Sequence, residues 1–386
     1  MTEMLFWSVL LLLLYAYVGY GVLMLALAQL RRARPVIEPT TSMRVTLLIV
    51  AHNEQAVIGR RLENALTLQT GIHKLQVVVV SDGSTDHTEE IVRYYQPQGV
   101  ELIALSPQQG KIHALNTVIP TLESDIVVFS DANSMYHPDA LLHLLKHFGN
   151  TRIGGVSGQL NVPRRQRGWL GKAEAAYLTY DQALKQAESR IGNTISAQGG
   201  IYAVRRTLLQ PIPDAVTDDF FQSAQIIAQG YRLVYEAAAI AEEEVSDKLH
   251  GEFSRRVRST EQGMRALMIL RCLFNPMRYD FYAVQLFSHK LLRRLSPFLL
   301  ILLLALSLIL SGQHIGYAVF ASLQLLFYTI ASATVVLPGL RRLPGTSLAM
   351  FFFIGHLAMA IGVWNAMRGK RSTKWVSVRA RYQEGD

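Results

Sequence analysis

Three short polar clusters in the middle of the chain contain residue types that could do chemistry. They read AHNE at 51–54, SDGSTD at 81–86 and SDAN at 130–133, and each follows an apolar run. Asp and Asn often mark a turn, because they hydrogen-bond to their own backbone and tolerate unusual dihedral angles. Carboxylates at the end of a strand also bind hard cations together with phosphates. Each cluster taken alone leaves both interpretations open.

The apolar runs before these clusters predict a sheet, because unalternated β-branched runs are typical of strands covered on both faces. The predicted strands are 45–50, 75–80, 101–105 and 125–129. Stretches with helical spacing lie between them, at 54–69, 86–95 and 111–120. This βαβαβαβ order predicts an α/β fold with a mostly parallel sheet.

Parallel strands expose their carboxyl ends at one edge, so the three polar clusters are expected to share one crevice. The alternative is that Asn53, Glu54, Ser84 or Asp86 only caps the helix that follows. The first strand-to-helix turn lacks the glycine-rich fingerprint of dinucleotide sites.

Asp131 with Mg²⁺ or Mn²⁺ could hold a diphosphate, because these cations bind one or two carboxylates plus the phosphates themselves. Lys111 would add a positive charge from the start of a helix. The inferred ligand is a nucleoside diphosphate compound.

Composition indicates a membrane protein. Half of the 386 residues are hydrophobic and 17% are charged. Residues 4–30 carry no charge, and this run is longer than the roughly 20 residues that span a bilayer as a helix. An uncleaved membrane anchor is favoured over a cleaved signal peptide, because the apolar run is too long and is preceded by Glu3 instead of a basic region. Residues 295–340, interrupted at 311–316, and residues 343–367 predict three further spans.

Basic residues beside the spans predict the orientation. Arg31, Arg32, Arg34, Arg293 and Arg294 place the polar middle in the cytoplasm, with the spans in the cell (inner) membrane. The basic tail RGKRSTKW at 368–375 contradicts this rule if every span crosses, so either 343–367 does not fully cross or the rule fails there. The net charge of +9 fits membrane headgroups better than nucleic acid, which is not expected as a partner. The single cysteine, Cys272, excludes an intrachain disulfide and fits a cytoplasmic domain.

The expected organisation has five parts. They are an N-terminal span with its basic flank (1–34), a cytoplasmic catalytic domain (43–260), amphipathic interfacial helices (261–294), C-terminal spans (295–367) and a basic tail (368–386). The interfacial part alternates basic and large apolar residues, which is typical of helices lying among headgroups. The alternative is an ordinary helix packed on the catalytic domain.

Six motifs in this order resemble the family 2 glycosyltransferases with a GT-A fold. They are LLIVAHNE, VVVVSDGSTD, GKIHALN, VVFSDANS, GGIYAVRR and VTDDFFQSAQIIAQGYRLVYE. The resemblance covers roughly Val45 to Arg258. With its flanking spans, the chain is similar to the membrane-integrated branch that includes cellulose, hyaluronan and poly-N-acetylglucosamine synthases.

The resemblance implies a role for each matching residue. His52 and Glu54 would lie by the uracil and ribose, Asp82 would bind the nucleoside and Lys111 would contact phosphate. Arg258 would clamp the diphosphate with help from Arg255, in a segment RRVRS (255–259) that has Ser259 where the family has a tryptophan.

The same resemblance assigns the metal, the base and the acceptor pocket. Asp131 and Asn133 match the metal motif, with Asn in place of the second acid, and would bind Mg²⁺ or Mn²⁺. Asp219 matches the catalytic base and is preceded by Asp218 instead of the family's Glu. The acceptor pocket would be shaped by Gly199 and Gly200 with Asp218.

The expected function is inverting transfer of a sugar from a nucleotide donor, preferably a UDP-sugar, to a lipid-linked or growing glycan acceptor. Ser259 lacks an aromatic face and four spans are few for a conduit, so products of one or a few sugars are favoured. The alternative is a processive polysaccharide synthase, in which Trp169 or Tyr177 stacks on the sugar and a second copy or an export partner completes the channel. A nucleotidyltransferase and a non-catalytic nucleotide-binding regulator are the remaining alternatives.

Overall fold

The structure is a computed structural model that describes every residue except 33, 162, 164–168, 244–248, 344 and 372–386. The chain divides into two compact units. The sheet unit contains Arg31–Gln166, Asp181–Ser246 and Arg371–Asp386. The helical unit contains Met1–Leu30, Arg167–Tyr180 and Asp247–Lys370. Trp169 and Tyr177, considered above as stacking residues, have side chains outside the described part.

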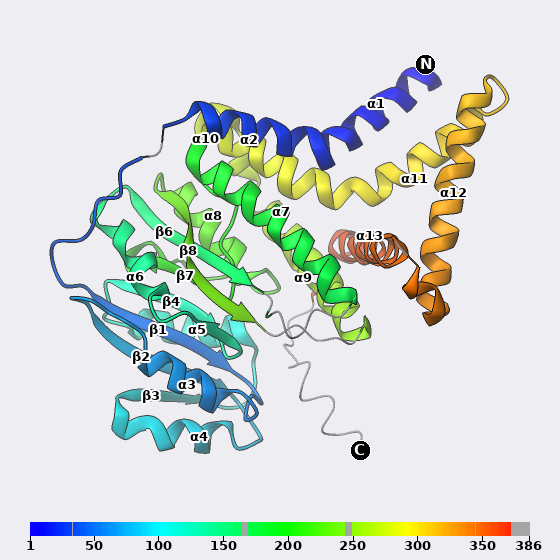
Figure 1. The fold of residues 1–386 in the computed structure, drawn as a ribbon. Coiled ribbons are helices and arrows are strands. Elements are labelled where there is room, and N and C mark those ends of the chain that lie inside the picture. Colours follow the sequence, from blue (N-terminus) through cyan, green and yellow to red (C-terminus); the bar gives the residue numbers. More distant parts are fainter. Residues whose placement is uncertain (33, 162, 164–168, 244–248, 344, 372–386) are drawn as a thin grey trace. The chain divides into compact units, whose positions relative to one another are not determined.

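The sheet unit is built on one eight-stranded sheet with the order β3-β2-β1-β4-β7-β6-β8-β5 (Figure 1). The strands are β1 Arg44–Ala51, β2 Lys74–Asp82, β3 Val100–Leu105, β4 Ile126–Asp131, β5 Ser134–Tyr136, β6 Ile153–Asn161, β7 Tyr202–Arg205 and β8 Arg232–Glu243. Strands β3, β2, β1 and β4 form a continuous parallel half. All four strands predicted from the sequence are confirmed.

The other half of the sheet is mixed. Strand β7 is antiparallel to both β4 and β6, β6 is parallel to β8, and β5 is antiparallel to β8. The prediction of a mostly parallel sheet is therefore right for one half only. Glycines allow the close packing of this half: a Cβ at Gly158 in β6 would lie 2.5 Å from the carbonyl oxygen of Ala239.

Helices cover the sheet and fill its core. They are α3 Ile58–Leu66, α4 Thr88–Tyr95, α5 Lys111–Val118, α6 Ala140–Leu145 and α8 Asp218–Ala228. The three helices predicted between the strands are confirmed, although the first begins at Ile58 and not at Glu54. Leu47 and Ile49 of β1 pack in one buried cluster with Leu62 of α3 and Leu144 of α6. A long helix, α7 Trp169–Ile191, continues from the helical unit into the sheet unit.

The helical unit contains four helices long and apolar enough to cross a membrane. The first, Thr2–Leu30, consists of α1 Thr2–Leu14, a π-helical segment Tyr15–Gly19 and α2 Tyr20–Leu30. The second, Pro276–Leu310, consists of α10 Pro276–Gln285, a π-helical segment Leu286–Leu292 and α11 Arg293–Leu310. The others are α12 Ile315–Val336 and α13 Thr346–Met367. Four apolar helices are thus present in the order in which the spans were predicted.

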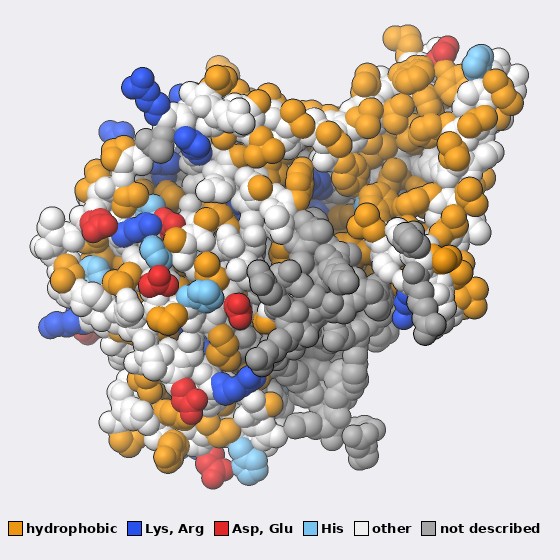
Figure 2. Space-filling model, in the orientation of Figure 1, with side chains coloured by type: hydrophobic (Ala, Val, Ile, Leu, Met, Phe, Trp, Pro, Cys, Tyr) orange, Lys and Arg blue, Asp and Glu red, His pale blue; other side chains and the backbone are white. Residues whose placement is uncertain are grey.

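Exposed apolar side chains gather on these helices, as Figure 2 shows in orange. Leu11 of α1, Ile309 of α11 and Leu323 of α12 are each at least 60% exposed. In Figure 1, α13 is seen nearly end-on and α12 from the side, so the two helices cross steeply.

The stretch 262–292 differs from its predicted form. Its first part ends helix α9 Leu249–Ile269, and a 3₁₀ turn Arg271–Phe274 and α10 follow. Tyr279 and Asp280 break the helical geometry of α10. From Leu286 the chain runs on into α11, so the second span begins at Pro276 and not at Leu295. The headgroup location of this stretch stays a prediction.

Candidate active site

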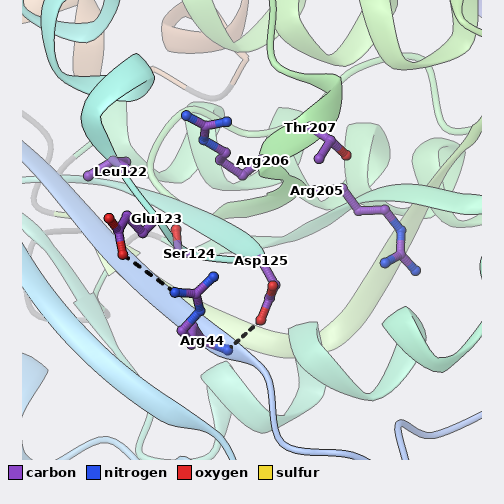
Figure 3. Close-up of a pocket in the computed structure, with 8 residues that line it drawn as sticks. All are labelled: Arg44, Leu122, Glu123, Ser124, Asp125, Arg205, Arg206 and Thr207. Carbon is purple, nitrogen blue, oxygen red and sulfur yellow. Dashed lines mark hydrogen bonds and ion pairs between the residues drawn. The ribbon is translucent and has the colours of Figure 1, made fainter.

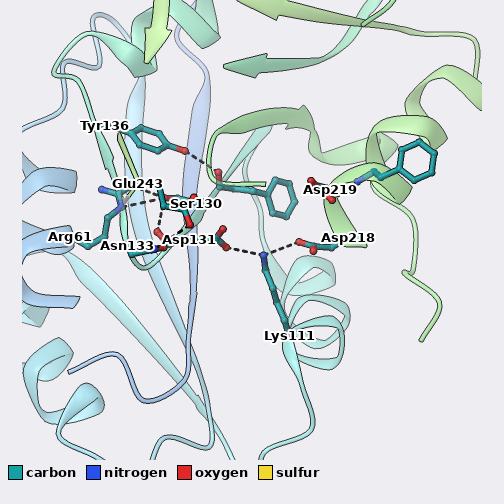
Figure 4. A network of polar contacts seen from close by, with 11 residues as sticks. Arg61, Lys111, Ser130, Asp131, Asn133, Tyr136, Asp218, Asp219 and Glu243 are labelled. Atoms are coloured by element: carbon teal, nitrogen blue, oxygen red, sulfur yellow. Dashed lines mark hydrogen bonds and ion pairs between the residues drawn. The ribbon is translucent and has the colours of Figure 1, made fainter. Parts of the chain in front are cut away.

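Lys111 joins two acids from different elements at the carboxyl edge of the parallel strands (Figure 4). Its Nζ lies 2.9 Å from Oδ1 of Asp131, at the end of β4, and 3.0 Å from Oδ2 of Asp218, at the start of α8. Gly110, with φ 103°, precedes Lys111 and lets the chain enter α5 sharply. The structure therefore brings together three of the predicted site residues in one bridge.

The bridge fixes the charge of Lys111. Burial opposes the charged form of this amine, but the carboxylates of Asp131 and Asp218 outweigh it and raise the pKa of Lys111 above its ordinary value. The Lys111 side chain is 22% exposed, so the ion pairs are only partly screened by water. Lys111 thus supplies a permanent positive charge at this edge.

Asp82 holds the loop that leads to Lys111. Its side chain is fully buried, and its two oxygens accept hydrogen bonds from the backbone N–H groups of Gln109 at 2.9 Å and Gly110 at 2.8 Å. Nδ1 of His52 lies 2.8 Å from the carbonyl oxygen of Asp82. In this structure the Asp82 carboxylate binds the backbone of the loop before Lys111. Its contact with a nucleoside stays a prediction.

Polar side chains also tie the ends of β1 and β2 together. Asn53, in the left-handed conformation with φ 53°, accepts a hydrogen bond from the backbone N–H of Thr85 at 2.8 Å. Asp86 accepts from the backbone N–H of Thr88, the first residue of α4, at 3.0 Å. The backbone N–H of Glu54 donates to the hydroxyl of Thr88, and Glu54 is buried. Asp86 thus binds the first turn of α4, although the N-cap position itself is held by His87.

The turn after β4 carries the predicted metal motif. The amide nitrogen of Asn133 donates to Oε1 of Glu243, at the end of β8, at 3.2 Å. Among the described residues no group of three or more His, Cys, Asp or Glu side chains is arranged to hold a metal ion. One carboxylate and one amide oxygen nevertheless fit Mg²⁺ or Mn²⁺, because these ions take most of their remaining ligands from water and substrate phosphates. Glu243 was not predicted.

Asp219, the predicted base, lies one residue after Asp218 in the first turn of α8. Its Oδ1 accepts a hydrogen bond from the backbone N–H of Phe220 at 2.7 Å. A Cβ at Gly199 would lie 3.4 Å from Oδ2 of Asp219, so the two predicted residues are neighbours. Gly200 is constrained differently, since a Cβ there would lie 2.6 Å from Oγ of Ser134.

Arg61 of α3 is a buried cation behind this turn. Its Nε and Nη2 donate to the hydroxyl of Ser130 at 3.2 and 3.1 Å, and its Nη1 donates to Asn64 at 3.0 Å. The guanidinium lies 4.7 Å from the ring centre of Tyr136. Burial lowers the pKa of Arg61 to about 10, which leaves it protonated at neutral pH. In the described part of the chain no carboxylate forms an ion pair with Arg61.

Arg61 was not predicted as a site residue, because a basic residue in a helix usually indicates an exposed face. Tyr202 of β7, whose ring stacks on that of Phe129 with 4.5 Å between ring centres, was not predicted either. Burial raises the pKa of Tyr202 well above its ordinary value, and the negative charges of Asp218 and Asp219 raise it further. Tyr202 therefore stays neutral, and its buried hydroxyl has no hydrogen-bond partner among the described residues.

The other residues predicted to bind the nucleotide-sugar donor, Arg255 and Arg258, belong to the helical unit. Arg255 of α9 donates from its Nε to Glu252 at 2.8 Å, and Arg256 pairs with the same carboxylate at 2.5 Å. Burial alone would raise the pKa of Glu252, but the two arginines lower it. Arg258 lies in the same helix. The diphosphate contacts of Arg255 and Arg258 stay predictions.

A hollow of about 520 Å³ lies at the amino ends of β1 and β4, away from the Lys111 bridge (Figure 3). Its lining residues are Arg44, Leu122, Glu123, Ser124, Asp125, Arg205, Arg206 and Thr207. Arg44 pairs with Glu123 at 3.6 Å, and its backbone N–H donates to Asp125 at 2.8 Å. None of the predicted site residues lines this hollow.

The parallel half-sheet carries acids and a lysine at its carboxyl edge, which is where open α/β sheets bind their ligands. Residues 46–212 match the family described as glycosyl transferase family 2. The chain therefore contains a region similar to family 2 glycosyltransferases, together with four helices long and apolar enough to cross a membrane. The resemblance drawn from the six motifs is confirmed.

Known relatives agree with this assignment. The chain is 26% identical over 241 residues to a poly-beta-1,6-N-acetyl-D-glucosamine synthase of Staphylococcus aureus (strain COL), covering 61% of this chain and 57% of the relative. It is 25% identical over 234 residues to the synthase of the same name from Staphylococcus epidermidis, covering 58% of this chain and 55% of the relative. The chain thus spans little more than half the length of these relatives.

One solved structure is similar over nearly the whole chain. It is a mannosyltransferase from Pyrobaculum calidifontis, in complex with GDP-Man and Mn²⁺. The TM-score is 0.72 at 21% identity, and the match covers 95% of this chain and 100% of the mannosyltransferase. At this identity the likeness establishes the fold, and the predicted GT-A fold is confirmed.

We expect Arg61→Met to lower the free energy of unfolding by about 2 kcal/mol, because three hydrogen bonds in a buried site are lost. The measurement is thermal unfolding of the purified protein in detergent. Arg60→Met, at the exposed neighbouring position, is the matched control. Equal stability of the two variants would show that Arg61 does not hold the turn after β4.

Proposed function

We propose that this protein transfers a sugar, with inversion, from a nucleoside diphosphate donor to an acceptor at the membrane. The observation that carries the proposal is the Lys111 bridge between Asp131 and Asp218, with Asp219 one residue further along α8. A cation and a carboxylate base at the same sheet edge are the two groups that a direct displacement at a sugar carbon requires.

Each residue of the bridge has a role in this chemistry. Asp219 takes the proton from the acceptor hydroxyl as that oxygen attacks the anomeric carbon. Lys111 holds positive charge where the departing diphosphate becomes more negative. One base on the face opposite the leaving group gives inversion of the anomeric centre. His52 and Glu54 are assigned to the nucleoside on the strength of the sequence motifs.

Asp131 and Asn133 would hold Mg²⁺ or Mn²⁺ together with the donor phosphates. When bound, the ion would neutralise charge on the diphosphate. The mannosyltransferase of similar fold contains Mn²⁺ with its nucleotide sugar, which supports a divalent cation here. In the structure Lys111 already neutralises Asp131, so it shares this carboxylate with any incoming cation.

The donor is proposed to be a UDP-sugar. The solved mannosyltransferase contains GDP-Man, so a GDP-sugar is the second candidate. The catalytic domain is proposed to face the cytoplasm at the cell (inner) membrane, on the basis of Arg31, Arg32 and Arg34 after the first span. Membrane lipids surround the four apolar helices.

The acceptor is proposed to be lipid-linked and to receive one or a few sugars. Ser259, in place of the family's stacking tryptophan, is the residue that favours short products. The second candidate is a processive synthase that elongates a glycan, and the synthase names of the staphylococcal relatives favour it. In that case a second copy of the chain or an export partner completes the conduit.

We expect Asp219→Asn to reduce transfer by about a hundredfold to ten-thousandfold and to leave nucleotide affinity nearly unchanged, because the amide keeps the shape but cannot accept a proton. The assay is release of UDP or GDP by the detergent-purified protein from a panel of nucleotide sugars. Asp214→Asn, at an exposed position five residues earlier, is the control. Normal turnover in Asp219→Asn would remove this residue from the mechanism.

Chelation with EDTA should lower the transfer rate on the order of a hundredfold, and Mg²⁺ or Mn²⁺ should restore it. We expect Asp131→Ala to respond to neither ion and to lose UDP-dependent Mn²⁺ binding, measured by electron paramagnetic resonance. Asp139→Ala, which removes a carboxylate that is 53% exposed, serves as the control. Full activity in excess chelator would mean that Lys111 neutralises the departing diphosphate without a divalent cation.

Radiolabelled donor incubated with the protein and membrane lipid should give label confined to an organic-extractable glycolipid. The expectation follows from Ser259, which offers no aromatic face to a sugar chain. Products are sized by gel filtration after lipid extraction. A high-molecular-weight polymer that glycosidases degrade would establish the processive alternative.

A further inference from the structure

The hollow at the amino ends of β1 and β4 is formed where three segments of the sheet unit meet (Figure 3). Strand β7 is antiparallel to β4, so its last residue, Arg205, pairs with Ile126, the first residue of β4. The backbone N–H of Arg206 donates to the carbonyl oxygen of Asp125 at 3.0 Å, and the backbone N–H of Asp125 donates to that of Arg44 at 2.8 Å. The backbone thus places three arginines on the wall of one hollow.

The hollow is separate from the candidate active site. Strand β4 leads from the hollow at Ile126 to Asp131, and a rise of about 3.3 Å for each residue separates the two places by about 17 Å. The volume of about 520 Å³ lies within the range of pockets that bind small organic ligands, roughly 300–1,000 Å³. The hollow is therefore large enough for a ligand of its own.

Positive charge exceeds negative charge on the wall of the hollow. Its charged lining residues are three arginines and two acids, Glu123 and Asp125. Arg44 pairs with Glu123 at 3.6 Å. Arg205 and Arg206 form no ion pair with a described carboxylate, since their side chains donate to backbone carbonyl oxygens instead. A cleft with an excess of one charge attracts ions of the opposite charge, so this wall favours an anion.

Two polar atoms of the lining residues have no hydrogen-bond partner within the described part of the chain. They are Nε of Arg206 and Oγ of Ser124, and both are buried. Both groups can donate a hydrogen bond, and a buried donor without a partner is costly. A ligand with acceptor oxygens can supply the missing partners once these side chains turn toward it, and rotamer changes of this kind are common on binding.

A purely structural role explains only part of this arrangement. Arg205 donates from Nε to the carbonyl oxygen of Ile153 at 2.8 Å and from Nη2 to that of Phe148 at 2.7 Å. These bonds fasten β7 to the start of β6 and to the turn before it. They do not account for the unpaired donors of Arg206 and Ser124, or for the volume beside them.

We propose that the hollow binds a small organic phosphate, with Arg206, Ser124 and Arg44 as its contacts. A guanidinium suits phosphate because its planar fork can make two parallel hydrogen bonds with it. The volume beyond one phosphate group would hold the organic part beside Leu122, the apolar residue of the lining. The proposal does not depend on the proposed function, because none of these residues belongs to the candidate active site.

The test is isothermal titration calorimetry on the full-length protein, purified in an uncharged maltoside detergent without phosphate buffer. The probes are glucose 6-phosphate, ribose 5-phosphate and AMP, compared with glucose, ribose, adenosine, inorganic phosphate and succinate. We expect at least one organic phosphate to bind more tightly than its parent compound, inorganic phosphate and succinate. Saturating UDP with Mn²⁺ should leave this binding unchanged, since the candidate active site lies at the other end of β4.

Variants of the lining locate the bound probe. Arg206→Gln should weaken binding by about ten- to a hundredfold and Ser124→Ala by about two- to tenfold. Ser124→Ala should not lower the thermal unfolding temperature, because its hydroxyl has no partner to lose. Glu123→Gln, which removes an exposed opposing charge, should strengthen binding by about two- to fivefold.

Arg44→Gln and Arg93→Gln form a matched pair, because each removes a largely exposed arginine that pairs with a glutamate. Only Arg44→Gln should weaken binding, and thermal unfolding is measured on every variant. The site is overturned if no organic phosphate binds more tightly than its parent, if UDP displaces the probe, or if folded Arg206→Gln and Ser124→Ala bind normally. Equally tight binding of inorganic phosphate or succinate would overturn the assignment to an organic phosphate.

Discussion

The ion bridge at Lys111 is the constraint on which the candidate site depends. Asp131 and Asp218 come from a strand end and a helix start far apart in the sequence, and their like charges would repel without the shared ammonium. The position of that ammonium depends in turn on Asp82, which accepts the backbone N–H groups of Gln109 and Gly110. Asp82 in β2 thus holds the loop that positions Lys111, and Lys111 in turn pairs with Asp131 and Asp218. The positions of the site residues therefore depend on a strand of the sheet.

Much of the sheet unit could be predicted because its signals are local. Unalternated apolar runs identify β1 to β4, and the rule that parallel strands end at one edge brings Asp131 to the crevice. The mixed half could not be predicted, because β5 and β7 are short and the register of an antiparallel pair depends on distant partners. Arg61 could not be recognised either, since nothing in the residue type distinguishes a buried guanidinium from an exposed one.

The spans could be predicted from length and hydropathy alone, yet their internal geometry could not. A π-helical segment leaves the composition of a helix unchanged, so Tyr15–Gly19 has no signature in the sequence. The start of the second span at Pro276 could not be predicted either, because charged residues lie inside the helix. His289, Lys290 and Arg293 suggest an end to an apolar run, whereas the helix passes through them without interruption.

These π-helical segments also set the rotational phase of the helices that contain them. Each residue of an α-helix turns the chain by about 100°, so a widened turn shifts every later side chain to a new azimuth. Tyr20–Leu30 therefore points its side chains in directions that Thr2–Leu14 alone would not dictate. The two spans run antiparallel, because Phe6, Val9 and Leu13 of α1 pack against Leu303, Leu306 and Leu310 of α11. The widened turn at Leu286–Leu292 therefore sets which side chains of α11 face α1. Deletion of a single residue from Leu286–Leu292 would rotate the α11 side chains that follow it away from their contact with α1.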